Sequence, residues 1–126
     1  MAFMQFWRTF KRSVTHALAG LRFAFREERN FQIECVIGAI VIMLTFLLPL
    51  TGIERSLMLF LIGTVLTLEL FNTAFERMLD MLKPRIHPYV KVVKDTVAGA
   101  VLIGSVTAAL IGFLLLAPYL WALIKV

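Results

Sequence analysis

Apolar residues dominate three long stretches of the chain, and charged residues gather between these stretches. Residues 35–53 and 96–124 contain no charged side chain, and residues 56–68 contain none before Glu69. Uninterrupted apolar runs of this kind are typical of helices that cross a membrane. We therefore predict three transmembrane helices, over about residues 33–50, 55–82 and 89–123.

The segment before the first apolar stretch combines apolar and basic residues at helical spacing. One side carries Phe3, Phe6, Trp7, Phe10, Val14, Leu18, Leu21 and Phe25, and the other carries Arg8, Lys11, Arg12, Arg22 and Arg26. This pattern is typical of a helix that lies in the membrane interface. We predict an amphipathic surface helix over about residues 3–29, and its basic, aromatic start argues against a cleaved secretory signal.

The composition narrows the class to an all-α integral membrane protein. Of 126 residues, 60% are hydrophobic and only 17% are charged, which leaves no room for a separate soluble domain. We therefore expect residues 1–126 to form a single membrane domain. Cys35 is the only cysteine, so an intramolecular disulfide is excluded and a packing role is expected.

The basic residues predict how the chain is oriented in the membrane. Six precede the first predicted span and five lie between the second and third, whereas only Arg55 and Lys125 lie on the other side. Basic loops stay in the cytoplasm, so the N-terminus and the 77–95 segment are expected there and the C-terminus outside. The net charge of +5 is explained by this topology, and nucleic-acid binding is not expected.

Acidic residues in the second predicted span are the main candidates for chemistry. At about 100° per residue, Glu69, Asn72, Glu76 and Asp80 share one face of about a quarter-turn, opposite Leu70, Ala74, Arg77 and Met81. Carboxylates within a membrane are costly and usually face a protein interior or water. A proton relay, a cation pathway, a metal site and a structural ion-pair network are the four possible uses of such a face.

Other charged residues are expected at the membrane level of Glu76. Glu27 and Glu28 close the surface helix, and Lys94 and Asp95 open the third span. Carboxylates with a nearby lysine suit a magnesium–nucleotide complex, although no glycine-rich loop ending in Gly-Lys-Ser/Thr is present. The sequence thus permits phosphoryl transfer at an unconventional site. A non-enzymatic cation or proton conductor and a membrane scaffold are the alternatives.

Four blocks of sequence resemble the small prokaryotic membrane lipid kinases, a family that includes diacylglycerol kinase and undecaprenol kinase. These blocks are Ala19–Leu21, Glu28–Glu34, Glu69–Asp80 and His87–Leu102, and together they cover nearly the whole chain. The resemblance implies an ATP-dependent kinase of the bacterial cytoplasmic membrane, with its site on the cytoplasmic side. It also implies Mg²⁺ as cofactor and a homotrimer with sites shared between subunits.

The resemblance implies a role for each matching residue. Glu69 is expected to be the general base that takes the proton of the lipid hydroxyl, and Glu28 and Glu76 are expected to hold the metal. The expected nucleotide contacts, besides Glu28 and Glu76, are Asn72, Asp80, Arg85, His87, Lys94, Asp95 and Arg12. The expected lipid contacts, besides Glu69, are Asn30, Phe31, Glu34 and Ala98.

The chain departs from the family pattern at several positions. Phe75 stands where a smaller aliphatic residue is usual, and Thr9 stands where a basic residue contacts nucleotide, so that Arg8 or Arg12 would substitute. Taken from the residues alone, His16 and His87 are ordinary turn or interface residues. The His87-Pro88 and 98–102 blocks look more like the undecaprenol kinase branch. They favour undecaprenol slightly over diacylglycerol as the acceptor.

Overall fold

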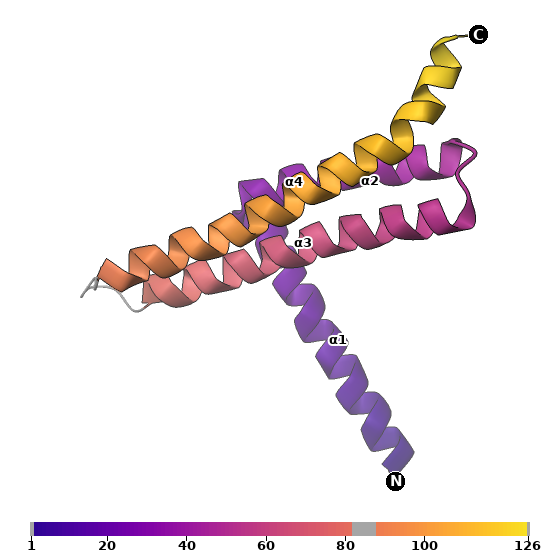
Figure 1. Ribbon diagram of the computed structural model, residues 1–126. Helices are drawn as coiled ribbons and strands as arrows, with labels where there is room; N and C mark the ends of the chain where they lie inside the picture. The colour runs from indigo at the N-terminus through magenta and orange to yellow at the C-terminus, as the bar shows by residue number, and fades with distance from the viewer. Residues whose placement is uncertain (1, 82–87, 126) are drawn as a thin grey trace.

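The computed structural model describes residues 2–81 and 88–125, and within these ranges it contains four α-helices and no strand (Figure 1). The helices are α1 (Ala2–Glu27), α2 (Arg29–Leu47), α3 (Gly52–Met81) and α4 (Pro88–Ile124). α2, α3 and the Tyr89–Ile124 part of α4 are long and apolar enough to cross a membrane. The predicted all-α class with three membrane-spanning helices is confirmed.

α1 runs at a steep angle to the other three helices and projects away from them (Figure 1). Every described side chain of α1 is exposed except that of Ala24, which is 1% exposed. This arrangement is consistent with a helix that lies along the membrane surface. Glu28 alone separates α1 from α2, with extended backbone angles (φ −112°, ψ 108°). α2 consequently begins at Arg29, earlier than the expected residue 33.

α3 packs against both α2 and α4, and the three helices run roughly along one direction (Figure 1). The buried apolar core lies toward the α2–α3 turn and consists of Leu48, Leu50, Met58 and Leu116. Large apolar side chains elsewhere on these helices, such as Phe60 and Phe113, point outward. Because lipid is as apolar as these side chains, an exposed apolar surface is expected for a membrane-spanning bundle.

A hydrogen-bonded cluster fixes the α2–α3 turn against α4, and we call Thr51, Glu54 and Tyr119 the turn cluster. The backbone N–H and the hydroxyl of Thr51 both donate to Glu54 Oε2 at 2.8 Å, and Thr51 Oγ1 accepts from the Glu54 N–H at 3.3 Å. This reciprocal capping box explains why α3 begins at Gly52. Tyr119 Oη of α4 donates to the same Glu54 oxygen at 2.8 Å.

Hydroxyl side chains within the three long helices donate to the backbone carbonyl four residues earlier. These bonds are 2.7–2.9 Å long and come from Thr45, Ser56, Thr64, Thr67 and Thr96. Each hydroxyl proton is therefore satisfied within its own helix, which matters where no water is available.

Candidate functional site

The acidic face of α3 turns toward the other helices. Glu69 is 4% exposed and Thr73 is 6% exposed, while Asn72 and Glu76 are partly buried. Asp80, near the end of the helix, is exposed. The Oδ1 atom of Asn72 is buried and has no hydrogen-bond partner among the described residues. The face therefore carries acceptor groups that the described part of the protein leaves available for a ligand.

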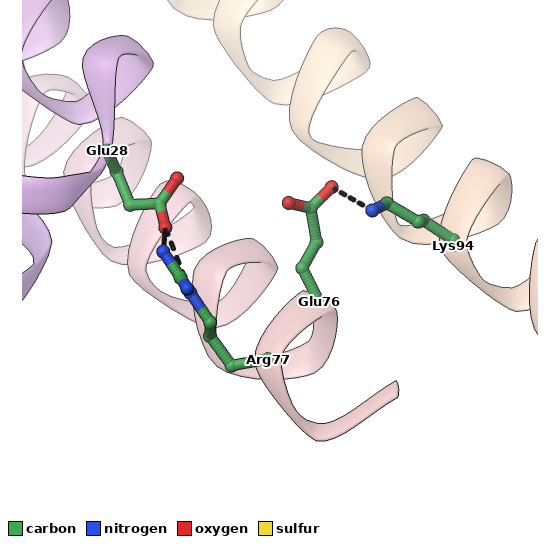
Figure 2. A network of polar contacts seen from close by, with 4 residues as sticks. All are labelled: Glu28, Glu76, Arg77 and Lys94. Atoms are coloured by element: carbon green, nitrogen blue, oxygen red, sulfur yellow. Dashed lines mark hydrogen bonds and ion pairs between the residues drawn. The ribbon is translucent and has the colours of Figure 1, made fainter. Parts of the chain in front are cut away.

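Two acid–base pairs stand at the end of this face (Figure 2). Glu28, at the start of α2, accepts at Oε1 from Nε and Nη2 of Arg77, at 3.2 and 2.6 Å. Glu76 Oε1 lies 3.5 Å from the Nζ atom of Lys94 on α4. Figure 2 shows the four side chains reaching into the space between the start of α2, the end of α3 and α4. The structure thus joins three segments that are far apart in the sequence.

Glu69 lies near this cluster but is more deeply buried than Glu28 or Glu76. Its charge interacts with those of Glu28 and Glu76, and the charge of Glu34 interacts with that of Glu69. Among the described residues, Arg77 and Lys94 pair with Glu28 and Glu76, and no ion pair reaches Glu69. Glu69 is therefore the buried carboxylate whose proton-accepting oxygens are not already held by a cation.

Among the described residues of α1, α2 and α4, no side-chain hydrogen bond or ion pair joins the remaining candidates to the cluster of Glu28, Glu76, Arg77 and Lys94. Asp95 and Ala98 on α4, Asn30 on α2 and Arg12 on α1 are exposed, and Phe31 is buried at 4% exposure. Arg85 and His87 lie outside the described residues. The structure therefore places Glu28, Glu69, Glu76 and Lys94 in one region of the bundle. No hydrogen bond or ion pair among the described residues connects Arg12 to this region.

Arg77 is a site residue that the sequence reasoning missed. Helical spacing places it opposite the acidic face of α3, yet its long side chain reaches Glu28 and its guanidinium lies over the ring of Phe23 at 5.3 Å. The sequence did offer an indication of this role, because Arg77 directly follows Glu76 and Glu28 was expected at the same depth in the membrane. The pairing itself depends on where α1 ends and α2 begins.

An apolar cavity of about 420 Å³ lies between α2, α3 and α4. Aliphatic side chains such as Ile37, Val65 and Leu66 line it, together with Glu34 and Ser105. The Oε2 atom of Glu34 and the Oγ atom of Ser105 are buried; the two side chains interact with each other, but neither atom makes a well-formed hydrogen bond among the described residues. The cavity therefore combines an apolar wall with two polar atoms that a hydroxyl-bearing ligand could satisfy.

The carboxylates of Glu28 and Glu76 have the donor chemistry that Mg²⁺ prefers. In the described part of the chain, no group of three or more His, Cys, Asp and Glu side chains is placed to hold a metal ion by itself. Mg²⁺ is commonly bound through one or two carboxylates, waters and substrate phosphates rather than by an all-protein cage. The residues thus fit a magnesium–nucleotide complex better than a bare metal ion.

Comparison with known proteins places the chain beside lipid kinases. The family described as prokaryotic diacylglycerol kinase matches residues 15–116. The undecaprenol kinase of Bacillus subtilis (strain 168) is 39% identical over 111 residues, which cover 88% of this chain and 90% of that protein. A diacylglycerol kinase of Synechocystis sp. is 38% identical over 112 residues, covering 88% of this chain and 64% of that protein. That of Haemophilus influenzae is 37% identical over 91 residues, covering 72% and 77%.

Proposed function

The chain belongs to the prokaryotic diacylglycerol kinase family and is a lipid kinase, and we propose that it transfers the γ-phosphate of Mg-ATP to the hydroxyl of undecaprenol. The observation that carries this proposal is the buried carboxylate of Glu69 beside the paired charges of Glu28 and Glu76. Diacylglycerol is the alternative acceptor, because relatives named for each lipid are similar to this chain at 39% and 38% identity.

In the proposed reaction, Glu69 acts as the general base. Its carboxylate takes the proton of the lipid hydroxyl while the hydroxyl oxygen forms a bond to the γ-phosphorus of ATP. The bond from that phosphorus to the β–γ bridging oxygen breaks, and ADP leaves. The products are lipid phosphate and ADP, and the proton on Glu69 is then released to water. Burial of Glu69, at 4% exposure, supports this role because a base that meets a lipid hydroxyl must lie within the bundle.

We propose that Glu28 and Glu76 hold the magnesium ion of Mg-ATP. Magnesium supplies charge neutralisation of the phosphates when it is bound. Lys94 lies beside Glu76 and would contact a phosphate oxygen. The buried amide oxygen of Asn72, which has no hydrogen-bond partner among the described residues, lies on the same face of α3 as Glu76. The further nucleotide contacts that we propose are Asp80, Arg85, His87, Asp95 and Arg12.

The cavity between α2, α3 and α4 supports a lipid as the acceptor. Its apolar wall suits an isoprenoid or acyl chain, and Glu34 provides a polar group on this wall. The charges of Glu34 and Glu69 influence each other, and we propose that the lipid hydroxyl is held between Glu34 and the base. Asn30, Phe31 and Ala98 complete the lipid contacts that we propose.

We propose that the active site faces the cytoplasm of a bacterial inner membrane and that the protein is a homotrimer. The bundle end that holds Arg77 and Lys94 is opposite the turn that precedes Arg55, as the positive-inside rule requires. A shallow groove on α3, lined by residues that include Gly63, Thr64 and Thr67, supports close packing of a second helix. Native mass spectrometry tests the assembly, with three times the 14.3-kDa chain mass as the expected species.

Transfer of radiolabelled γ-phosphate from Mg-ATP to lipid tests the proposed reaction. The purified protein is offered undecaprenol and diacylglycerol separately, beside the variants Glu69→Gln and Glu54→Gln. Removing a general base lowers the rate by roughly 10²- to 10⁴-fold, so we expect Glu69→Gln to lose nearly all transfer. Glu54→Gln is the control, because it removes a carboxylate from the same helix at the opposite end; since it also weakens the capping box there, all activities are compared per amount of folded protein, as measured by circular dichroism.

Each result bears on a separate part of the proposal. Label in undecaprenol supports the proposed acceptor, and label in diacylglycerol alone replaces it with the alternative. Full activity of Glu69→Gln contradicts the role of Glu69 as base, whichever lipid is labelled. Equal losses in Glu69→Gln and Glu54→Gln contradict it as well, since the effect would then not depend on position.

A further inference from the structure

We infer that Arg77 is a phosphate-binding residue that holds Glu28 in the nucleotide-free protein and turns to the nucleotide when the metal takes Glu28. The inference rests on the proposed binding of Mg-ATP at Glu28 and Glu76. It adds Arg77 to the residues predicted from the sequence, and it proposes that the four side chains in Figure 2 change partners when Mg-ATP binds.

The contact between Arg77 and Glu28 is the type that a metal ion would replace. Both donors of Arg77 meet one oxygen of Glu28, Oε1, at 3.2 and 2.6 Å. This oxygen is one of the two that Glu28 offers as metal ligands, so the guanidinium and a magnesium ion compete for the same carboxylate. Glu76 is in the same situation, because its Oε1 atom lies 3.5 Å from Lys94 Nζ.

The charges of the four residues explain why the exchange favours a nucleotide. Glu28 and Glu76 carry two negative charges, and Arg77 and Lys94 carry two positive charges, so the cluster is neutral. A divalent cation bound by the two carboxylates would balance them by itself. Arg77 and Lys94 would then lose Glu28 and Glu76 as partners, and Arg77 would keep only the weaker influence of Glu27 and Asp80, so that both cations could turn to the negative phosphates of ATP.

The side chain of Arg77 is also free enough to make this movement. Half of its surface is exposed (50%), against 22% for the side chain of Glu28. Its guanidinium also makes a cation–π contact with the ring of Phe23 at 5.3 Å, and this contact does not require Glu28. A guanidinium also presents a planar fork that matches phosphate oxygens, which the ammonium of a lysine does not.

Two binding measurements on the purified protein test the inference without relying on turnover. The first is the affinity for a non-hydrolysable ATP analogue in the presence of Mg²⁺, and the second is the affinity for Mn²⁺ without nucleotide, measured by electron paramagnetic resonance. Arg77→Met keeps the apolar stem and removes the charge, and Arg77→Lys keeps the charge and removes the fork. Arg22→Met is the matched control, because it removes one exposed basic residue from α1.

The inference predicts that the two affinities of Arg77→Met change in opposite directions. Loss of one charge-assisted hydrogen bond to phosphate weakens binding of the analogue in the presence of Mg²⁺ by about tenfold, before the smaller gain at the released Glu28 is counted. Release of Glu28 from an exposed ion pair tightens Mn²⁺ binding by up to about fivefold. Arg77→Lys is expected to weaken analogue binding less than Arg77→Met, and Arg22→Met is expected to stay within about twofold of the wild type on both measures.

Other outcomes overturn the inference. Wild-type values of both affinities in Arg77→Met would show that Arg77 neither binds phosphate nor competes with the metal for Glu28. A loss of both affinities, with an unchanged circular dichroism spectrum, would show that Arg77 only shapes the site. If the wild-type protein itself bound neither the analogue nor Mn²⁺, the proposed function would fail first and the inference with it.

Discussion

Replacing Tyr119 by phenylalanine should remove one defined hydrogen bond between α4 and the α2–α3 turn. Tyr119 Oη donates to Glu54 Oε2 at 2.8 Å, and that oxygen also accepts two bonds from Thr51, each of 2.8 Å. Glu54 is therefore not left without donors in the variant, so the loss is limited to the deleted bond. Hydrogen bonds between transmembrane helices contribute about 0.6 kcal/mol on average and about 1.7 kcal/mol at most. The charged acceptor favours the upper part of this range, and we expect about 1 to 1.5 kcal/mol.

A double-mutant cycle isolates this interaction from the other roles of Glu54. The free energy of unfolding is measured for the wild type, Tyr119→Phe, Glu54→Gln and the double variant, by titrating dodecyl sulfate into detergent micelles and following circular dichroism. Glu54→Gln should cost more than Tyr119→Phe, because it also weakens the capping box at the start of α3. We expect a coupling free energy of about 1 kcal/mol. Additive effects, with a coupling below about 0.3 kcal/mol, would refute the bond between Tyr119 and Glu54.

Three further predictions concern packing, the nucleotide and the metal. Gly104→Ala places a Cβ atom against the end of the Leu68 side chain and should lower the free energy of unfolding by about 1 kcal/mol. Gly99→Ala is the control, because its Cβ atom would meet no described atom of another part of the protein within 4 Å, and it should not destabilise the protein. Equal effects of the two substitutions would contradict the packing of Gly104 against Leu68. Lys94→Met removes the cation beside Glu76 and should raise KM for Mg-ATP about tenfold, without a matching rise in KM for the lipid in a steady-state assay. EDTA should abolish lipid phosphorylation and added Mn²⁺ should restore it, because carboxylates bind both metals; turnover in EDTA would contradict the metal role of Glu28 and Glu76.

Much of the fold follows from the sequence because burial in a membrane leaves few alternatives. Long apolar runs must form helices that satisfy their own backbone groups, so α2, α3 and α4 could be predicted from the charge gaps alone. The helix boundaries were less accurate. α2 begins at Arg29 because the break after α1 is only one residue long, and no proline or glycine marks it.

The site was harder to predict because its residues come from three segments. Helical spacing placed Glu69, Asn72 and Glu76 on one face of α3, and that arithmetic needs no information about other helices. The same arithmetic set Arg77 aside, because spacing describes where a side chain leaves the backbone and not where a long side chain ends. The bond between Glu54 and Tyr119 joins positions 65 residues apart, and no local pattern marks it.

The bonds that the hydroxyl groups make to their own helices have a consequence for biosynthesis. A helix that enters the membrane before its neighbours have arrived must carry its polar side chains without their help. Thr64, Thr67 and Thr96 meet this condition, because each hydroxyl donates to a carbonyl of the same helix. Glu69 has no such internal bond in the described structure. The hydroxyls are thus compatible with insertion of one helix at a time, whereas Glu69 must enter the membrane without a partner in its own helix, so α3 carries a cost of insertion that its hydroxyl groups do not add to.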